Sequence, residues 1–538
     1  MVMMTDGAAE TSVDVRGDRV VGVLREYERP ARDQLFLMAV SMRDWLEEGH
    51  LVWFVLDVVA RMDTRALHRR PAGAVGRRPY LPEMMLALVL YGYCCGVRFS
   101  RRLEAACRTD AAFRVICGGL EPDHATIARF VVDHERALEE LFVEGVRLCA
   151  AAGLVDLSVV ALDGTKIAAD ASMARNRDAV WIRREVARLM ELTGQDQSAA
   201  EGQDGPAGVT AAGATGGAGG RLARLEAALV VIEAEDAAAG AETERAARAA
   251  AAAAEHGRKL PGRKPKDSRA ALARAQFDHQ AASERLSALQ AAAADKRAAV
   301  QRGETPPRGP RLRIDQAKAA LERAAAALHA AQEAVQNDPA PARRANITDP
   351  DSRIMSTKDG WVQGYNAQAI VNSQQIVLAC DVSQDPGDVQ LYQPMNQRLT
   401  DTLTAARITG EVELELADAG YCSEHNLTSP GPDRLIATTK DWKQRRTARE
   451  LGQTDGPPPP DATLLEEMEH LLRTPQGTAA YAKRSELIEP VFGDRKHNRQ
   501  IRSFRRRGLS AVRSEWAFIH LAGNIRKLYQ HHAATAAA

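Results

Sequence analysis

The first third of the chain carries apolar residues at helical spacing. They recur every three or four positions within residues 32–150, which predicts a mostly helical N-terminal region. Pro82 suits the first turn of one of these helices, because a first-turn proline loses no helical hydrogen bond. The predicted helices cover residues 35–46, 83–95, 100–107 and 125–148.

From residue 157 the pattern changes to that of a β-strand. The run LSVVALDGTKIAAD is rich in β-branched residues and predicts a strand that ends at Asp163. Four later segments have the same character, and the first two of them predict a hairpin: residues 365–372, 375–382, 412–417 and 434–438. These strands predict an α/β domain after the helical region.

Between the first and second strands lies a long helix-forming insertion. Residues 202–220 are rich in Gly and Ala and predict a flexible stretch. Three segments rich in Ala, Glu, Arg and Leu follow, at 221–256, 268–300 and 314–336. They predict an inserted arm of three helices. Two groups of helix-breaking residues separate these helices: Pro261, Gly262 and Pro265, then Pro306, Pro307 and Pro310. Residues 452–462, with four consecutive prolines, predict a second interruption.

Composition narrows the class of protein. With 538 residues and 45% hydrophobic content, the chain can build several cores. The longest apolar stretch, residues 84–97, is shorter than the roughly 20 residues of a membrane span. No secretory signal is recognisable in residues 1–21, so we expect a cytoplasmic location and no membrane partner. The seven cysteines lack zinc-ligand spacing and are predicted to be reduced thiols.

Charge is unevenly distributed, although the formal net charge is zero. Residues 495–527 contain many Lys and Arg but a single acidic residue, Glu515. Residues 61–108 are similarly rich in Arg. Both regions predict a polyanionic partner. In the first basic region, Arg98, Arg101 and Arg102 lie between short helices and suit a helix-turn-helix DNA reader. A helical bundle with solvated arginines explains the same pattern.

Two aspartates occupy equivalent places on two predicted strands. Asp163 and Asp418 each follow an apolar run and precede a glycine. A single aspartate there is commonly a turn or cap residue. Two of them on adjacent strands would project from the same edge, where α/β folds bind ligands.

A third acid, Glu489, lies in the segment YAKRSELIEPVFGDRK. Glu489 and Lys496 are seven residues apart and would share a face of an ideal helix, although Pro490 disfavours helical backbone at Glu489. Three carboxylates suit hard cations, so we expect two Mg²⁺ ions, with Mn²⁺ as an alternative. Such a pair, about 3.5–4 Å apart, is typical of phosphodiester transfer.

Five segments together resemble a known family. They are DGTKIAADAS (163–172), NITDPDSRIM (346–355), GWVQGYNAQAIV (360–371), LADAGYCSEHNL (416–427) and the run from YAKRSELIEP to NIRKL (481–528). They resemble bacterial insertion-sequence transposases with a ribonuclease-H-like DDE domain and a Tyr-Arg-Glu-Lys signature. Residues 77–104 resemble the helical InsH-type N-terminal domain of that family.

The resemblance implies a site and a reaction. It implies that Asp163, Asp418 and Glu489 are the catalytic, metal-binding acids, and that Tyr481, Arg484 and Lys496 contact DNA phosphates. Four residues separate Arg484 from Glu489, where the signature is often quoted with three, so Glu486 is the competing third acid. The implied reaction is metal-dependent cleavage at the ends of a mobile element, followed by strand transfer into target DNA. The family usually acts as a synaptic homodimer on double-stranded DNA.

The basic run after the third acid is expected to neutralise DNA phosphates, which makes binding fall with salt. The residues concerned are Arg499, Arg502, Arg505, Arg506 and Arg507. Trp361 and Trp442 are expected to pack inside the domain rather than to stack on a base, and Asp388 is expected to lie in a turn.

The predicted organisation has five parts, with the catalytic domain interrupted by the arm. Residues 1–30 and 531–538 are expected to be tails. Residues 31–152 form the helical DNA-binding domain, 153–175 and 345–530 the catalytic domain, and 176–344 the inserted arm.

Three other functions remain open from the sequence. The first is a domesticated or inactive copy that acts as a DNA-binding repressor. The second is a nuclease of the same fold. The third is a scaffolding protein built around the arm, which would need no carboxylates at three separated positions.

Overall fold

A computed structural model of the chain describes residues 41–68, 80–200, 218–255, 268–303, 312–337, 343–439, 452, 454 and 456–537. Residues 1–47 and 48–538 form two compact units. The described part of the first unit is a short 3-10 helix, η1 (Met42–Trp45), whose start is capped by Ser41 and Asp44. No helix among the described residues combines the length and hydropathy needed to cross a membrane.

The second unit begins with a cluster of short helices. Pro82 occupies the first turn of α2, as predicted, and every residue from Met85 to Cys94 is buried. The segment predicted as one helix over 125–148 is two helices, because His134 ends the first and bonds through its ring to Phe130 O and Leu67 O. The helices are α1 (Leu51–Arg61), η2 (Arg65–His68), α2 (Pro82–Cys94), α3 (Ser100–Thr109), α4 (Ala111–Cys117), α5 (His124–Asp133) and α6 (Glu135–Ala151).

A mixed six-stranded sheet forms the centre of this unit. Its order is β4-β5-β1-β7-β8, and β6 also pairs with β5. The pairs β1–β5, β4–β5 and β5–β6 are antiparallel, whereas β1–β7 and β7–β8 are parallel. The strands are β1 (Val159–Ala168), β4 (Arg353–Thr357), β5 (Gly360–Asn372), β6 (Val377–Ser383), β7 (Leu414–Ala417) and β8 (Asp433–Ile436). The α/β class and the β5–β6 hairpin are as predicted.

One strand boundary was predicted wrongly. Asp163 does not end β1, which continues to Ala168 because Thr165, Lys166 and Ile167 pair with β5. The Asp-Gly-Thr sequence is typical of a turn, but the long partner strand keeps it extended. The parallel pairing of β1 with β7 nevertheless stops at Leu162 opposite Ala417, so Asp163 and Asp418 both follow the last parallel pair.

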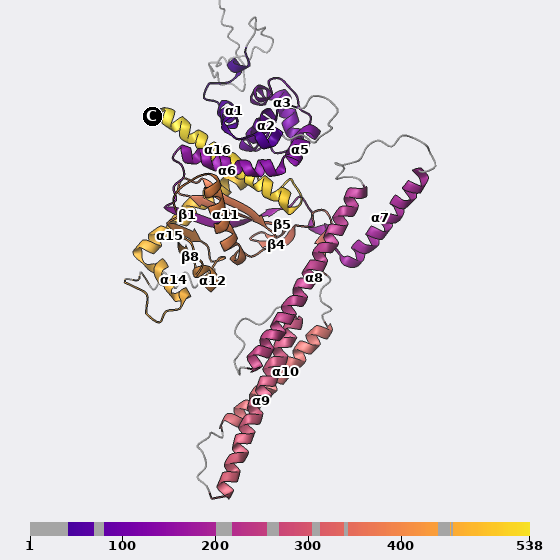
Figure 1. Cartoon of the computed structure of the whole chain (residues 1–538), viewed down its shortest axis with the longest axis vertical. Coiled ribbons are helices and arrows are strands. Elements are labelled where there is room, and N and C mark those ends of the chain that lie inside the picture. The colour runs from indigo at the N-terminus through magenta and orange to yellow at the C-terminus, as the bar shows by residue number, and fades with distance from the viewer. Residues whose placement is uncertain are drawn as a thin grey trace, which may run out of the picture. The chain divides into compact units, whose positions relative to one another are not determined.

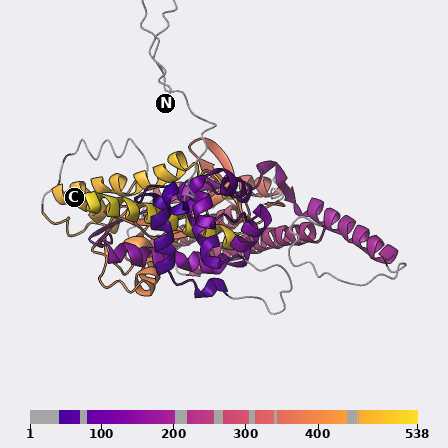
Figure 2. The ribbon, with the colours of Figure 1, turned by 90° about the horizontal axis from the view of Figure 1, so that it is seen from above.

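Helices from the second half of the chain cover the sheet. The C-terminal helix α16 (Leu509–Ala537) packs beside α6, α2 and β6, and α11 (Tyr392–Ala405) also covers β6 (Figures 1 and 2). On β1 and β7 lies α15 (Pro475–Gly493), which follows α14 (Leu464–Arg473). Shorter elements are η3 (Met173–Arg175), η4 (Val389–Leu391), α12 (Glu424–Leu427) and the π-helical turn η5 (Asp494–Asn498).

The three helices predicted for the insertion are present, and a fourth precedes them. They are α8 (Ala218–Glu255), α9 (Ser268–Gln301) and α10 (Leu312–Asn337), after α7 (Ala179–Ala200). Helix α9 packs against both α8 and α10 (Figure 1). Of the predicted flexible stretch 202–220, residues 218–220 begin α8 instead, and the rest lies outside the described residues, as do both groups of proline breaks.

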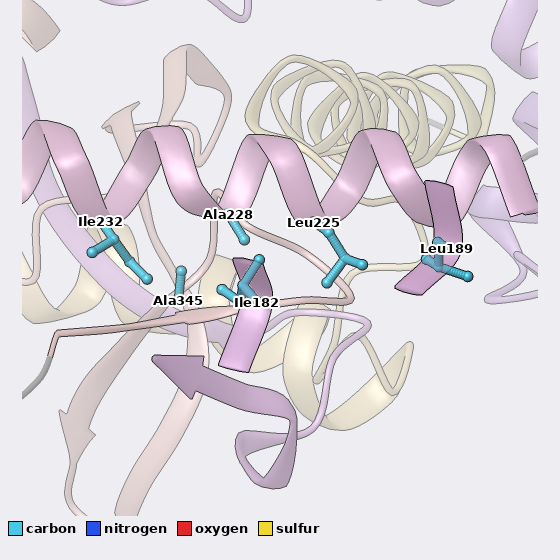
Figure 3. Packing of buried hydrophobic residues seen from close by; sticks show 6 residues of the cluster. All are labelled: Ile182, Leu189, Leu225, Ala228, Ile232 and Ala345. Atoms are coloured by element: carbon cyan, nitrogen blue, oxygen red, sulfur yellow. The ribbon is translucent and has the colours of Figure 1, made fainter. Parts of the chain in front are cut away.

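A separate apolar cluster packs the first two of these four helices together. It joins α7, α8 and β3 (Arg344–Asn346), which pairs with β2 (Asn176–Asp178) (Figure 3). Its buried members come from all three elements and are Ile182, Leu189, Leu225, Ala228, Ile232 and Ala345. All seven cysteines of the chain are free thiols, as expected.

Candidate active site

Asp163 and Asp418 lie at the end of the parallel pair formed by β1 and β7. The side chain of Asp163 is 20% exposed. Its Oδ1 accepts from Gly164 N at 2.8 Å, and its Oδ2 accepts from Arg484 Nη1 at 3.3 Å. Asp418 Oδ1 accepts from Gly420 N at 2.6 Å, which fixes the turn after β7. The predicted adjacency of these two acids is therefore present in the fold.

Electrostatics set Asp163 apart from an ordinary surface acid. The pKa of the Asp163 carboxyl is raised to about 6, mainly by burial; the charge of Arg484 opposes the rise, and the charges of Asp418 and Asp388 add to it. Burial thus disfavours the ionised form, and Arg484 compensates only in part. A perturbed carboxyl paired with a second acid at a strand end is a typical feature of a functional site.

The signature residues of α15 and η5 approach the same region. Tyr481 Oη donates to Ala417 O at 3.1 Å, directly before Asp418. Arg484 pairs with Asp163, and Lys496 Nζ donates to Thr165 Oγ1, two residues after Asp163 on β1. Burial lowers the pKa of Lys496, and the charge of Asp163 raises it. Two cations and a phenol therefore surround the strand end.

Glu489 does not join this group. It is exposed on α15, as is Glu486. In the described part of the chain, no three His, Cys, Asp or Glu side chains lie close enough together to hold a metal ion. Glu489 is five positions after Arg484, which corresponds to a rotation of about 140° at 3.6 residues per turn. The helix therefore cannot direct both side chains at Asp163 in one orientation.

Pro490 lies inside α15, contrary to the expectation that it would disturb the helix. A proline has no N–H and leaves the carbonyl four residues earlier without its helical partner. That carbonyl belongs to Glu486, and Gln375 Nε2 donates to it at 3.1 Å. The expected shared face of Glu489 and Lys496 does not form, because Lys496 lies in the π-helical turn η5 rather than in a regular helix.

A buried polar network beside Asp163 was missed by sequence reasoning, which treated Asp388 as a turn residue. Asp388 Oδ1 accepts from Lys166 Nζ at 3.2 Å, Asn366 Nδ2 at 2.8 Å and Gln368 Nε2 at 3.3 Å. Tyr421 Oη donates to Gln368 Oε1, and Tyr421 N donates to Asp418 O at 3.1 Å. The sequence feature that could have indicated this network is the pair of amide side chains, Asn366 and Gln368, on a buried strand, because buried amides need hydrogen-bond partners.

Gly164 belongs to the same region, because β-strand pairing brings it opposite Gln368. A Cβ at this position would lie 2.1 Å from Gln368 Nε2. The glycine after Asp163 therefore leaves room for the amide that supports Tyr421. Its presence in the DGT motif has a packing reason.

Two arginines expected to bind DNA are buried instead. Arg98 pairs with the buried Glu515 at 2.9 Å, and its side chain is 3% exposed. Arg499 is 5% exposed and lies 3.0 Å from Asp494 Oδ2. Neither guanidinium reaches the surface, so the prediction that Arg98 and Arg499 contact phosphates is wrong. A count of basic residues along the sequence does not separate buried arginines from exposed ones.

The other predicted DNA contacts lie nearer the surface. Arg506 is half-buried and pairs with Glu135, whereas Arg507 is exposed and pairs with Asp170 at 2.9 Å. Two guanidiniums lie near the ring of Phe99, with Arg505 Cζ 3.9 Å and Arg102 Cζ 5.2 Å from its centre. Among the arginines predicted to contact DNA, five are exposed: Arg101, Arg102, Arg502, Arg505 and Arg507.

The predicted burial of the two tryptophans can be compared with the structure for Trp361 alone. Trp361, on β5, is 68% exposed, so the expectation that it packs inside the domain is wrong. Trp442 lies outside the described residues.

Comparison with protein families gives two matches. Residues 40–133 match the model described as Transposase domain (DUF772), and residues 459–529 match that described as Transposase DDE domain. The first covers α1 to α5, and the second covers α14, α15 and most of α16. No curated protein and no solved structure matches the chain. The second match contains Tyr481, Arg484, Glu489 and Lys496, whereas Asp163 and Asp418 lie outside both.

Proposed function

We propose that the chain, whose residues 40–133 and 459–529 match transposase domains, is an insertion-sequence DDE transposase. In this proposal it cuts and joins DNA strands with divalent metal ions held at Asp163 and Asp418. The supporting observation is that these carboxylates follow the last pair of the parallel strands β1 and β7. The proposed catalytic domain is ribonuclease-H-like, and the proposed substrate is double-stranded DNA bound by two copies of the chain.

The two aspartates fit a hard divalent cation. Both offer carboxylate oxygens, which Mg²⁺ prefers and Mn²⁺ also accepts. Burial and neighbouring acids raise the pKa of Asp163 to about 6, so a cation held there would relieve an unfavourable concentration of negative charge. Two such ions, when bound, supply activation of the attacking oxygen and stabilisation of the leaving oxygen.

Glu489 is the proposed third carboxylate, and its recruitment requires α15 to turn. Arg484 Nη1 lies 3.3 Å from Asp163 Oδ2. A DNA phosphate is a strong partner for a guanidinium and would draw Arg484 away from Asp163. The π-helical turn η5 at the end of α15 provides a place where the helix can change its rotation. Glu486, three residues earlier on the same helix, is the competing candidate.

The cations around the site have a proposed role in holding DNA. Arg484 and Lys496 flank Asp163 and are placed to bind the phosphate that is cut. Tyr481 would position the turn that carries Asp418. The exposed arginines hold the flanking backbone in this proposal, and they are Arg101, Arg102, Arg502, Arg505 and Arg507.

The proposal is tested by cleavage of a labelled duplex that carries the ends of the element, with and without Mg²⁺. Wild type is compared with Asp163→Asn, Asp418→Asn and Glu489→Gln, and DNA binding of each variant is measured by gel shift. We expect every variant to bind and none to cut. Normal cutting by Glu489→Gln together with loss in Glu486→Gln would transfer the third role to Glu486.

A second candidate function is favoured by the separation of Glu489 from the aspartates. An inactive copy that represses by binding DNA needs no third acid at the site. Wild-type protein that binds the ends tightly but never nicks them, with either Mg²⁺ or Mn²⁺, would move this function ahead. Nicks without joined strand-transfer products would instead indicate a nuclease of the same fold.

A further inference from the structure

Three buried side chains between η5 and α16 carry polar nitrogens without partners. Arg495 is 3% exposed, Arg499 is 5% exposed and His520 is fully buried. Within the described residues, no hydrogen bond reaches Arg495 Nε and Nη2, Arg499 Nη1 and Nη2, or either ring nitrogen of His520. Buried polar groups in folded proteins are nearly always hydrogen-bonded, so such a concentration of free donors needs a physical reason.

Charge in this region is also out of balance. Arg495 Nη1 and Arg499 Nε both lie 3.0 Å from the same atom, Asp494 Oδ2. A third guanidinium, that of Arg526, donates to Cys94 O at 2.7 Å at the C-terminal end of α2. Lys527, the next residue, raises the positive charge further, although its Nζ bonds to Gln375 Oε1 at 2.7 Å. One carboxylate thus faces several cations.

The titration of these groups agrees with a shortage of negative charge. Burial, together with the charge of Arg499, lowers the pKa of Arg495 to about 9. Burial and the two arginines hold the pKa of His520 well below its usual value, so its ring is neutral and offers one N–H. The rings of Trp516 and His520 meet in a T-shaped contact, with 4.2 Å between ring centres.

The backbone leaves room for these cations. A Cβ on Gly523 of α16 would lie 1.8 Å from Arg495 Nη2. Any other residue at position 523 would displace the guanidinium. The glycine therefore permits a buried arginine whose Nε and Nη2 remain available.

We propose that Arg495, Arg499 and His520 form a buried binding site for a small inorganic anion, such as chloride or phosphate. The free nitrogens of the two guanidiniums and the imidazole N–H would donate to the anion, while Asp494 keeps its present contacts. An anion supplies both the missing acceptors and the missing negative charge.

The position of this site connects it to the carboxylates. Arg495 and Arg499 bracket Lys496, whose Nζ bonds to Thr165 beside Asp163. A bound anion would fix η5 and, through it, the orientation of Lys496. The site does not depend on the proposed DNA chemistry and can be tested without DNA.

Thermal unfolding of the full chain tests the proposal. The protein is placed in a buffer whose anion is large and organic, and chloride or phosphate is added in separate series at constant ionic strength. A ligand that binds the folded state raises Tm with saturation. We expect wild type to gain about 2–4 °C, and Arg499→Met to gain nothing.

The matched control is Arg188→Met, which removes an exposed arginine of α7 that is far along the chain from η5. It should respond to the anion as wild type does. If Arg499→Met fails to fold, broadening of the chloride NMR line by wild type, reversed by phosphate, replaces it as the readout. The proposal is overturned if wild type shows no anion dependence, or if Arg499→Met responds as strongly as wild type. The chloride and phosphate series show which anion binds better.

Discussion

At the scale of single residues, Asp163, a proposed metal ligand, shows how a buried carboxylate opposes stability. Its folded-state pKa, about 6, is above the usual value of 3.8. Between those pH values the unfolded chain releases a proton that the folded chain retains, so the contribution of this group to stability falls as pH rises from about 4 to 6 and stays low above. The shift corresponds to about 3 kcal/mol at most.

We therefore predict that Asp163→Asn is more stable than wild type at pH 7–8, by up to about 3 kcal/mol, because the amide carries no buried charge. The gain should shrink as pH falls to about 4. Urea unfolding of both proteins across this pH range measures the difference. Equal stability at every pH would mean that Asp163 is not strained.

The buried pair of Arg98 and Glu515 gives a second prediction at this scale. Glu515 also accepts from the backbone N–H groups of Arg505 and Arg506. Arg98→Ala leaves a buried carboxylate without its cation and should cost about 3–5 kcal/mol of unfolding free energy. Chemical denaturation measures this cost.

The control for Arg98→Ala is Arg101→Ala, three residues further along the chain. Arg101 is exposed, so its loss should change stability by less than about 0.5 kcal/mol while weakening DNA binding and its salt dependence. The interpretation of Arg98 as structural fails if the two variants lose equal stability.

At the scale of elements, α15 continues through Pro490 because another side chain replaces the lost hydrogen bond. Gln375→Ala removes the donor to Glu486 O and should destabilise the protein by about 1 kcal/mol. In the Pro490→Ala background the backbone N–H can serve that carbonyl, so the same substitution should cost less. A double-mutant cycle measures the coupling, and strict additivity would contradict this explanation.

The elements that the sequence predicts correctly are those with a long, regular pattern. Helices α2, α3, α8, α9 and α10 and the β5–β6 hairpin all follow such a pattern. The extension of β1 past Asp163 and the break at His134 depend on partners distant in sequence, namely β5 and Leu67. The secondary-structure propensity of a local segment gives no information about such distant partners.

The residues of the candidate site also differ in how far the sequence predicts their positions. The adjacency of Asp163 and Asp418 could be predicted because two parallel strands place their ends together. The position of Glu489 could not, since the sequence does not show that Arg484 takes the inward face of α15 or that η5 is a π-helical turn. Burial of Arg98 and Arg499 likewise arises from tertiary packing.

At the scale of the whole molecule, the apolar cluster of α7, α8 and β3 is separate from the core of the sheet. Leu225→Ala, at a position only 1% exposed, should cost about 2–5 kcal/mol and act locally on this cluster. Hydrogen exchange should show lost protection in α7 and α8 but not in β1.

Val230→Ala is the matched control, since Val230 lies on the same helix and is 63% exposed. Its effect should be within about 0.5 kcal/mol. Equal loss of protection in β1 and α8 after Leu225→Ala would show that the insertion and the sheet unfold as one unit.

The central claim is that Asp163 and Asp418 are ligands of the same catalytic metal site, and a change of ligand softness tests it most directly. Asp163→Cys and Asp418→Cys are assayed for cleavage of the element's ends with Mg²⁺ and with Mn²⁺. Thiolates bind Mg²⁺ poorly and accept softer ions better. We predict that both variants are inactive with Mg²⁺ and regain cleavage with Mn²⁺, whereas the Asn variants stay inactive with either ion. Failure of Mn²⁺ to restore either cysteine variant, with folding and DNA binding intact, would contradict the claim.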